Sequence, residues 1–161
     1  GPAQAPIMLV GEQPGDREDI EGRPFVGPAG RMLSRALDDA GIARESVYVT
    51  NAVKHFKFET RGKRRLHKRP SDAEIAACHD WLDAEIATVK PRLIIALGAT
   101  AARALTGRAT AVEANRGKRR DYTAGTELLI TVHPSFLLRM PESAKAAAYR
   151  RFVTDLKLAR R

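Results

Sequence analysis

The sequence predicts a three-layer α/β/α sandwich built on a central, mostly parallel sheet of four strands. Two observations support this fold: four short apolar runs have the composition of buried strands, and helix-like stretches lie between them. Strands that alternate with helices favour a parallel sheet with both faces covered. The chain has 161 residues, the size of one ordinary domain. We therefore expect a single domain over residues 1–161.

The four predicted strands are rich in Val, Ile and Leu, and each ends in Gly, Asn or His. They cover residues 7–11, 47–51, 93–98 and 128–133. The first strand starts only six residues into the chain, which leaves open whether a natural N-terminal segment precedes it.

The predicted helices have apolar side chains on one face and recognisable end signals. Gly41 is a natural stop for the first helix, and Ser71 with Glu74 forms a capping box at the start of the second. The helices are expected at residues 29–41, 71–89, 99–107 and 143–160. Residues 11–30 are so rich in Gly and Pro that we expect a long shaped loop without regular structure.

Polar side chains follow or close three of the predicted strands. Glu12 and Gln13 follow the first strand, Asn51 closes the second, and His133 closes the fourth. Ligands of parallel α/β sheets bind beyond the carboxyl ends of the strands. The sequence therefore predicts that these four residues converge on one rim of the sheet.

The net charge of +9 indicates a polyanionic partner, most often nucleic acid. The alternative is a merely soluble basic surface, but the positive charge is clustered at residues 61–69, at 116–120 and near the C-terminus.

Cys78 is the single cysteine, so no internal disulfide can form, which fits a reducing, bacterial-type cytoplasm. No apolar run is long enough for a membrane span.

Three motifs in the expected order carry a family resemblance. "GEQPG" (11–15) with "GRPFVG" (22–27), "TNAVK" (50–54) and "HPS" (133–135) resemble the uracil-DNA glycosylase superfamily, especially its family-4 enzymes. Two departures are informative. Gln13 stands where family 4 has Ala, and a basic stretch with a histidine, "GKRRLHK" (62–68), follows the second motif. Both features are similar to the UdgX type, which bonds covalently to uracil-containing DNA.

The resemblance implies a role for each motif residue. Phe25 would stack on uracil, with Gly11 and Ser135 beside it in the substrate pocket, although Phe25 alone could equally be a core residue. Asn51 would pair with the O4 and N3–H edge of uracil and reject cytosine; its other reading is a strand-end cap. His133 would donate a hydrogen bond to uracil O2, where charge develops, unless it is purely structural.

Glu12 would be the carboxylate beside C1′ that stabilises an oxocarbenium-like sugar. His67 would then attack C1′ in place of water, with Glu12 or Gln13 orienting its ring or taking its proton. The surrounding cations would favour the neutral, nucleophilic ring. They would also grip the DNA strand, and we assign this contact to Lys63, Arg64, Arg65 and Lys68. The alternative is a basic loop with an incidental histidine.

Apolar residues follow the "HPS" motif and could fill the space left by a flipped base. Among them we assign the wedge to Leu137, with Arg139 on a phosphate. The alternative is that one or two of these side chains simply pack on the C-terminal helix.

Relatives of this type carry a [4Fe–4S] cluster, and the resemblance implies that His55 and Cys78 are half of its ligand set. Four donors are normally required, and the first half, an N-terminal C-x-x-C pair, is absent from the sequence. Either a natural N-terminus carries it, or this chain holds no cluster, in which case Cys78 is a buried apolar residue and His55 a surface residue.

The first functional hypothesis is a monomer that excises uracil from single-stranded or duplex DNA and is captured covalently at C1′ through His67. The alternative is a conventional turnover uracil-DNA glycosylase of base-excision repair. A second alternative is a non-catalytic uracil-DNA sensor, against which Glu12 and His133 argue. A nucleotide-binding protein is disfavoured because no phosphate-binding glycine motif is present.

Overall fold

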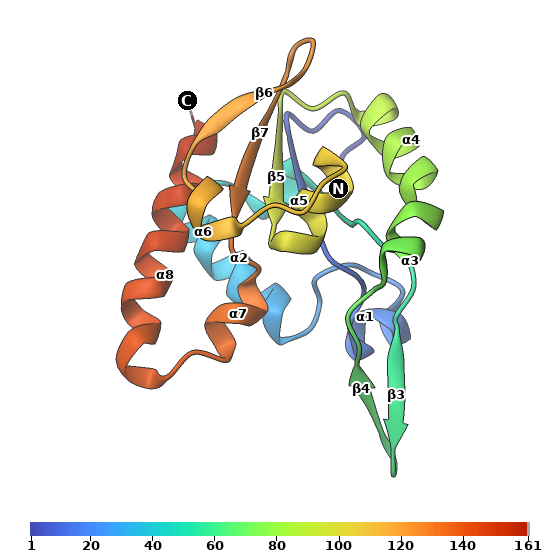
Figure 1. The fold of residues 1–161 in the computed structure, drawn as a ribbon. Helices are drawn as coiled ribbons and strands as arrows, with labels where there is room; N and C mark the ends of the chain where they lie inside the picture. The colour runs from blue at the N-terminus through green and yellow to red at the C-terminus, as the bar shows by residue number, and fades with distance from the viewer. Residues whose placement is uncertain (161) are drawn as a thin grey trace.

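The computed structural model describes residues 1–160, and its centre is a five-stranded sheet in the order β2-β1-β5-β7-β6 (Figure 1). Four neighbouring strands are parallel: β2 (Val47–Asn51), β1 (Ile7–Gly11), β5 (Leu93–Leu97) and β7 (Thr126–Thr131). The four predicted strands are therefore confirmed. The fifth, β6 (Arg119–Thr123), pairs antiparallel with β7 at the edge and was missed because its sequence, "RRDYT", is charged.

Helices cover both faces of the sheet, so the three-layer prediction is confirmed. One face carries α2 (Pro28–Ala40), α7 (Pro134–Leu138) and α8 (Glu142–Lys157). The other carries α3 (Asp72–Ala77), α4 (His79–Val89) and α5 (Ala99–Thr106). The remaining helical turns are α1 (Asp16–Glu21), α6 (Val112–Asn115), η1 (Arg44–Ser46) and η2 (Leu158–Arg160).

The two cores follow from the alternation of side chains along the strands. Leu9 pairs with Ile95, and Ile95 with Leu129, and all three contribute to the core under α2 and α8. Their chain neighbours, such as Met8 and Ile94, belong to the core on the opposite face. Each of these side chains is fully buried, so the central strands are a rigid base for whatever follows their ends.

Two helix predictions need correction. The expected single helix over 71–89 is two helices, α3 and α4, which meet at Cys78. Its capping box is present: the Ser71 hydroxyl accepts a hydrogen bond from the Glu74 amide, and the Glu74 carboxylate accepts one from the Ser71 amide. Residues 11–30 do not form a loop throughout, because they contain α1.

The basic stretch forms a β-hairpin outside the main sheet. Its strands are β3 (Phe58–Arg61) and β4 (Arg64–His67), and the turn between them is made possible by Gly62, with a positive φ of 60°. Figure 1 shows the hairpin projecting from the body of the protein, beyond α1. His67 is the last residue of β4 and pairs with Phe58, so it lies at the base of the hairpin, next to the body.

No helix in the described part of the chain, residues 1–160, is both long and apolar enough to cross a membrane.

Candidate active site

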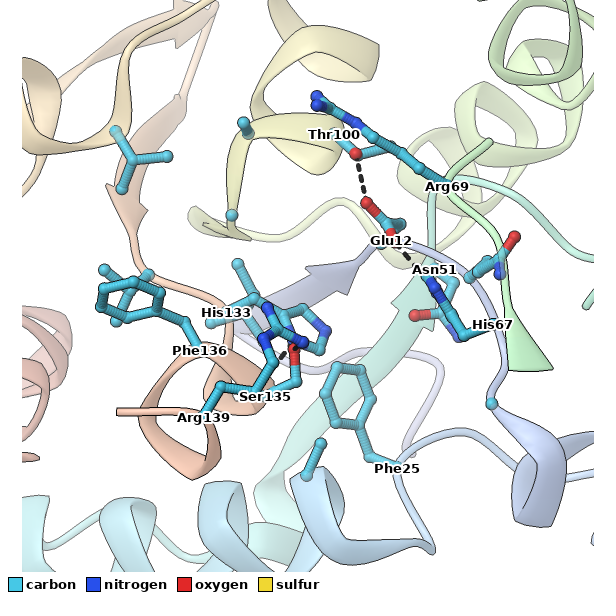
Figure 2. Close-up of a pocket in the computed structure, with 18 of the residues that line it drawn as sticks. Glu12, Phe25, Asn51, His67, Arg69, Thr100, His133, Ser135, Phe136 and Arg139 are labelled. Carbon is cyan, nitrogen blue, oxygen red and sulfur yellow. Dashed lines mark hydrogen bonds and ion pairs between the residues drawn. The ribbon is translucent and has the colours of Figure 1, made fainter. Parts of the chain in front are cut away.

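A cavity of about 770 Å³ opens where the parallel strands end. Its lining includes one polar residue after or at the end of each parallel strand: Glu12 after β1, Asn51 on β2, Thr100 after β5 and His133 after β7 (Figure 2). The convergence predicted from the strand ends is therefore present, and Thr100 joins it.

Phe25 forms one wall of this cavity, and Gly11 makes room for it. A Cβ atom on Gly11 would lie 2.6 Å from Cζ of Phe25 and 2.4 Å from Oδ1 of Asn51. Only glycine therefore allows the ring and the amide to lie together. Phe25 is 8% exposed and packs in the core under α2. It is therefore both a core residue and a residue that lines the cavity. Its ring centroid is 5.7 Å from that of His133.

Asn51 is buried, yet its Oδ1 atom has no hydrogen-bond partner. Leaving a buried acceptor unpaired costs about 1–3 kcal/mol, and in this protein that acceptor borders a cavity. The backbone at Asn51 is fixed from behind, where Lys54 Nζ donates to its carbonyl (2.7 Å) and forms an ion pair with Glu85 (2.5 Å). The free oxygen is thus held ready for a donor on a ligand.

His133 presents a neutral N–H donor. Its Nδ1 accepts a hydrogen bond from the Ser135 amide (3.1 Å) and lies 2.8 Å from the Ser135 hydroxyl. Because Nδ1 is an acceptor, the proton of the neutral ring is on Nε2. Burial lowers the pKa of His133 to about 4; the Glu12 charge opposes this shift, and the Arg139 charge adds to it. The ring is therefore neutral near pH 7.

Glu12 is an ionised carboxylate with two partners. One oxygen accepts a hydrogen bond from the Thr100 hydroxyl, and the other lies 3.1 Å from Nε2 of His67. Burial alone would raise the pKa of Glu12, but the hydrogen bonds from His67 and Thr100 outweigh it and leave the pKa below its ordinary value. Glu12 thus places negative charge between the strand ends and the base of the hairpin.

His67 reaches the cavity from the hairpin, and its side chain is 48% exposed. Figure 2 shows its ring facing Glu12 from the side opposite His133. The charged group in contact with the ring is the Glu12 carboxylate and not one of the neighbouring cations. Glu12 and His67 are in contact, as predicted. The sequence led us to expect cations around His67, but the charged group that contacts its ring is an anion.

Gln13 lines the cavity, and the hydrogen bonds found for its side chain in residues 1–160 go to the backbone and not to the His67 ring, so its catalytic role stays a prediction. It is 7% exposed, and its amide bonds the backbone of the two residues that flank the hairpin. Nε2 donates to the carbonyls of Lys57 (3.2 Å) and Lys68 (3.1 Å), and Oε1 accepts from the Lys57 amide (3.3 Å). Gln13 therefore fastens the base of the hairpin, and Ala at this position could make none of these bonds.

Arg65 is likewise a structural tie rather than a free DNA contact. Its guanidinium lies 2.6 Å from both Asp16 and Asp19 of α1, and over the rings of Phe56 (5.3 Å) and Phe58 (5.1 Å). The planar cation can pair with carboxylates and stack on aromatic rings at once. The hairpin is thus fixed to α1 through its inward-facing arginine.

The other hairpin cations divide into paired and free groups. Lys68 forms an ion pair with Glu59 (2.9 Å), whereas Lys63 and Arg64, at the exposed tip, pair with no acid in residues 1–160. The second basic run, 116–120, contributes mainly to the structure of the domain. Arg116 forms a buried ion pair with Asp155 (2.8 Å), and the run continues into the edge strand β6.

The wedge assigned to Leu137 is wrong, because its side chain is fully buried in the core under α2. Its neighbours Phe136 and Leu138 are 43% and 40% exposed, and Phe136 lines the cavity. Arg139 also lines the cavity, and it donates to the Ser135 hydroxyl (3.3 Å). The exposed apolar residue nearest the site is therefore Phe136.

Comparison with known proteins agrees with this geometry. The model of the uracil-DNA glycosylase superfamily matches residues 1–157. The chain belongs to this superfamily.

Three curated relatives are type-4 uracil-DNA glycosylases. That of Thermotoga maritima is 41% identical over 134 residues, which are 83% of this chain and 66% of the relative. That of Pyrobaculum aerophilum is 41% identical over 142 residues, 84% of this chain and 69% of the relative. That of Saccharolobus solfataricus is 42% identical over 99 residues, 61% of this chain and 43% of the relative. The chain thus spans about two thirds or less of the length of these relatives.

His55 and Cys78 were expected to be half of an iron–sulfur ligand set, and that assignment stays a prediction. Cys78 is buried and accepts a hydrogen bond from the Lys54 amide (3.5 Å), while His55, next along the chain, is exposed. Within residues 1–160, no three His, Cys, Asp or Glu side chains are grouped to hold a metal ion. A four-iron cluster needs four donors, so the described residues do not fit one.

Several residues that line the cavity were missed from the sequence, among them Thr100, Arg69 and Glu18. Thr100 follows β5 and bonds Glu12, and its position just beyond a strand end was the signal that could have identified it. Arg69 and Glu18 also line the cavity. Arg69 stood in the basic run without a distinguishing feature, and Glu18 lay in a segment expected to be a loop.

Proposed function

We propose that this chain excises uracil from DNA and is then captured covalently, through His67, at C1′ of the sugar it has exposed. The observation that carries the proposal is the meeting of His67 with Glu12, 3.1 Å apart, at the mouth of a cavity that contains an unpaired Asn51 oxygen and a neutral His133. Base recognition, departure of the base and capture then use separate groups of one site.

Recognition depends on Asn51 and Phe25. The unpaired Oδ1 of Asn51 suits the N3–H donor of uracil, and its amide N–H suits O4. Cytosine presents an acceptor at N3 and a donor at C4, so both contacts would fail. Phe25 offers the ring face on which the flipped base stacks, and this contact offsets part of the few kcal/mol needed to unstack the base.

Departure of the base depends on His133 and Glu12. As the C1′–N1 bond breaks, its electron pair leaves with uracil and negative charge grows on O2. The N–H of a neutral His133 stabilises that charge without transferring its proton, and such a donor is worth about 10²–10³-fold in rate. The carboxylate of Glu12 stabilises the positive charge left on the sugar.

Capture depends on His67, whose ring lies beside that carboxylate. The lone pair of the unprotonated ring nitrogen attacks C1′, so an N–C1′ bond replaces the C1′–N1 bond. The alkylated ring carries a positive charge until its remaining N–H proton passes by way of Glu12 to the uracil anion. The products are neutral uracil and a neutral alkylated imidazole.

The DNA strand is held by cations around the cavity. Lys63 and Arg64 at the hairpin tip bind phosphates from one side, and Arg139 binds from the side of His133. None of the three forms an ion pair within residues 1–160. Their contacts are independent of sequence and weaken with salt. The protein acts as a monomer in this proposal.

Conventional turnover is the competing function, and the 41% identity to type-4 uracil-DNA glycosylases favours it. In that case Glu12 directs water to C1′ and His67 only borders the site. The two functions share recognition and departure of the base and differ in the last step.

The test is uracil release from a single-stranded oligonucleotide with one deoxyuridine, measured by chromatography under single-turnover conditions. Wild type is expected to release uracil from this strand and no base from a matched deoxycytidine strand, and Asn51→Leu is expected to lose most of the release. A wild type that releases no base would leave only the sensor function. Equal release of cytosine would contradict the role of Asn51.

A further inference from the structure

The short helix α1 contacts both halves of the site. Asp16 and Asp19 hold Arg65 of the hairpin, as described above. Glu18, on the same helix, lines the cavity instead. Neither recognition, departure nor capture uses Glu18, although its carboxylate is in contact with the segment that carries Phe25.

Glu18 is bound to Gly27, the N-cap residue of α2. Its Oε1 accepts a hydrogen bond from the Gly27 amide (2.8 Å), which is two residues from Phe25. The carboxylate is enclosed by glycines. A Cβ atom on Gly15 would lie 2.7 Å from Oε2, and one on Gly27 would lie 3.1 Å from Oε1. The two glycines therefore allow this side chain to bridge the two loops.

Phe25 needs such support because its backbone is strained. Its φ is 54°, in the left-handed region that residues other than glycine rarely adopt. Its carbonyl oxygen also lies directly against Gly30, where a Cβ atom would be 1.9 Å away. A strained residue persists only when its surroundings hold it in place. In this segment, Gly30 contacts Phe25 from one side, and the Glu18–Gly27 bond fixes the chain just beyond it.

We propose that Glu18 is a positioning residue for uracil binding, which sets the stacking face of Phe25 through the Gly27 amide. The inference rests on the proposed function insofar as Phe25 is the face that receives uracil. Because α1 also holds Arg65, this one helix sets where the stacking face lies relative to the hairpin.

Three substitutions separate positioning from charge and from general stability. Glu18→Gln removes the charge and keeps an oxygen that can accept from Gly27. Glu18→Asp keeps the charge but withdraws the oxygen by one methylene, and Glu18→Ala removes both. Glu21→Ala is the matched control, since Glu21 lies on the same helix, is exposed and forms an ion pair with Arg23.

The experiment measures two quantities on each variant: the affinity for free uracil by calorimetry, and the NMR hydrogen exchange of the Gly27 amide with the ring shifts of Phe25. Glu18→Ala and Glu18→Asp are expected to bind uracil up to about tenfold more weakly, the upper end of the net contribution of one hydrogen bond. Their Gly27 amide should exchange at least tenfold faster. Glu18→Gln and Glu21→Ala should stay close to wild type.

Two results would overturn the inference. One is a Glu18→Ala protein that matches Glu21→Ala in both quantities. The other is a Glu18→Gln protein as weak as Glu18→Ala, which would assign the effect to charge. If wild type itself binds no uracil, while Gly27 and Phe25 still respond to Glu18→Ala, then Glu18 positions Phe25 but its role in uracil binding is wrong; whether the proposed function also fails is decided separately by the uracil-release assay.

Discussion

The pocket for the base and the hairpin that carries His67 are built in opposite ways. Asn51 ends and His133 follows a strand whose last three residues are buried, and the closest contacts of the pocket involve glycine. The hairpin strands make no ladder with the main sheet and are largely exposed. Side-chain ties hold the hairpin in place, chiefly Gln13 at its base and Arg65 on α1.

Under the proposed function, this difference implies that recognition and capture are separable. The pocket is built at the ends of the parallel strands, whereas His67, the proposed nucleophile, lies on a hairpin that is held by its own side-chain ties. Substitutions in the pocket should therefore impair both steps, and substitutions in the hairpin should impair capture alone.

The largest effect is expected in the pocket. His133→Ala removes the donor to the leaving base, so uracil release should slow by about 10²–10³-fold. Capture should slow equally, because it follows release. Single-turnover assays of both products measure this, with His79→Ala on the exposed start of α4 as the control. Capture that stayed fast while release slowed would break the proposed order of steps.

The next effect is expected at the hairpin ties. Arg65→Gln removes the pairing with Asp16 and Asp19, and displacement of His67 by about 1 Å is enough to slow adduct formation by roughly 10²-fold. Uracil release should change only a few-fold. Arg64→Gln, the adjacent residue without an acid partner, is the control. Equal losses in release and capture for Arg65→Gln would show that the hairpin and the pocket are one unit.

The pocket should also make stability depend on pH. The pKa of His133 is about 4 in the folded protein against 6.5 for the free side chain. Between these pH values, His133 is protonated in the unfolded chain but not in the native state. The free energy of unfolding therefore falls as the pH falls from 6.5 to 4, by about 3 kcal/mol in total. Urea denaturation at pH 7 and pH 4.5 measures it. His133→Gln should lose this part of the dependence, and an unchanged dependence would contradict the assignment.

The smallest effect is expected at the hairpin tip. Lys63→Gln should weaken DNA binding a few-fold whatever the sequence and reduce the slope of log K against log salt by about one. Fluorescence anisotropy over a salt series measures it. Arg150→Gln, an equal loss of charge on the exposed side of α8, is the control. Equal salt slopes for Lys63→Gln and Arg150→Gln would show that the hairpin tip does not contact DNA.

The pocket could be predicted from the sequence to a much greater extent than the hairpin. Its residues follow apolar strands, so strand prediction alone placed Glu12, Asn51 and His133 on one rim. The hairpin has polar, exposed strands without an apolar period, and nothing in its sequence shows that Arg65 turns inward while Arg64 does not. The assignment of the wedge to Leu137 was wrong for a related reason. In a run of three apolar residues, the geometry of helix α7 determines which side chain is buried.

The most direct test of covalent capture is intact-protein mass spectrometry, in denaturing buffer, after mixing the protein with a single-stranded oligonucleotide that contains one deoxyuridine. The account predicts a species with the mass of protein plus oligonucleotide minus uracil, absent for His67→Ala, and peptide mapping that places the link on His67. An oligonucleotide that loses uracil while the protein mass stays unchanged would contradict capture and leave conventional turnover as the function.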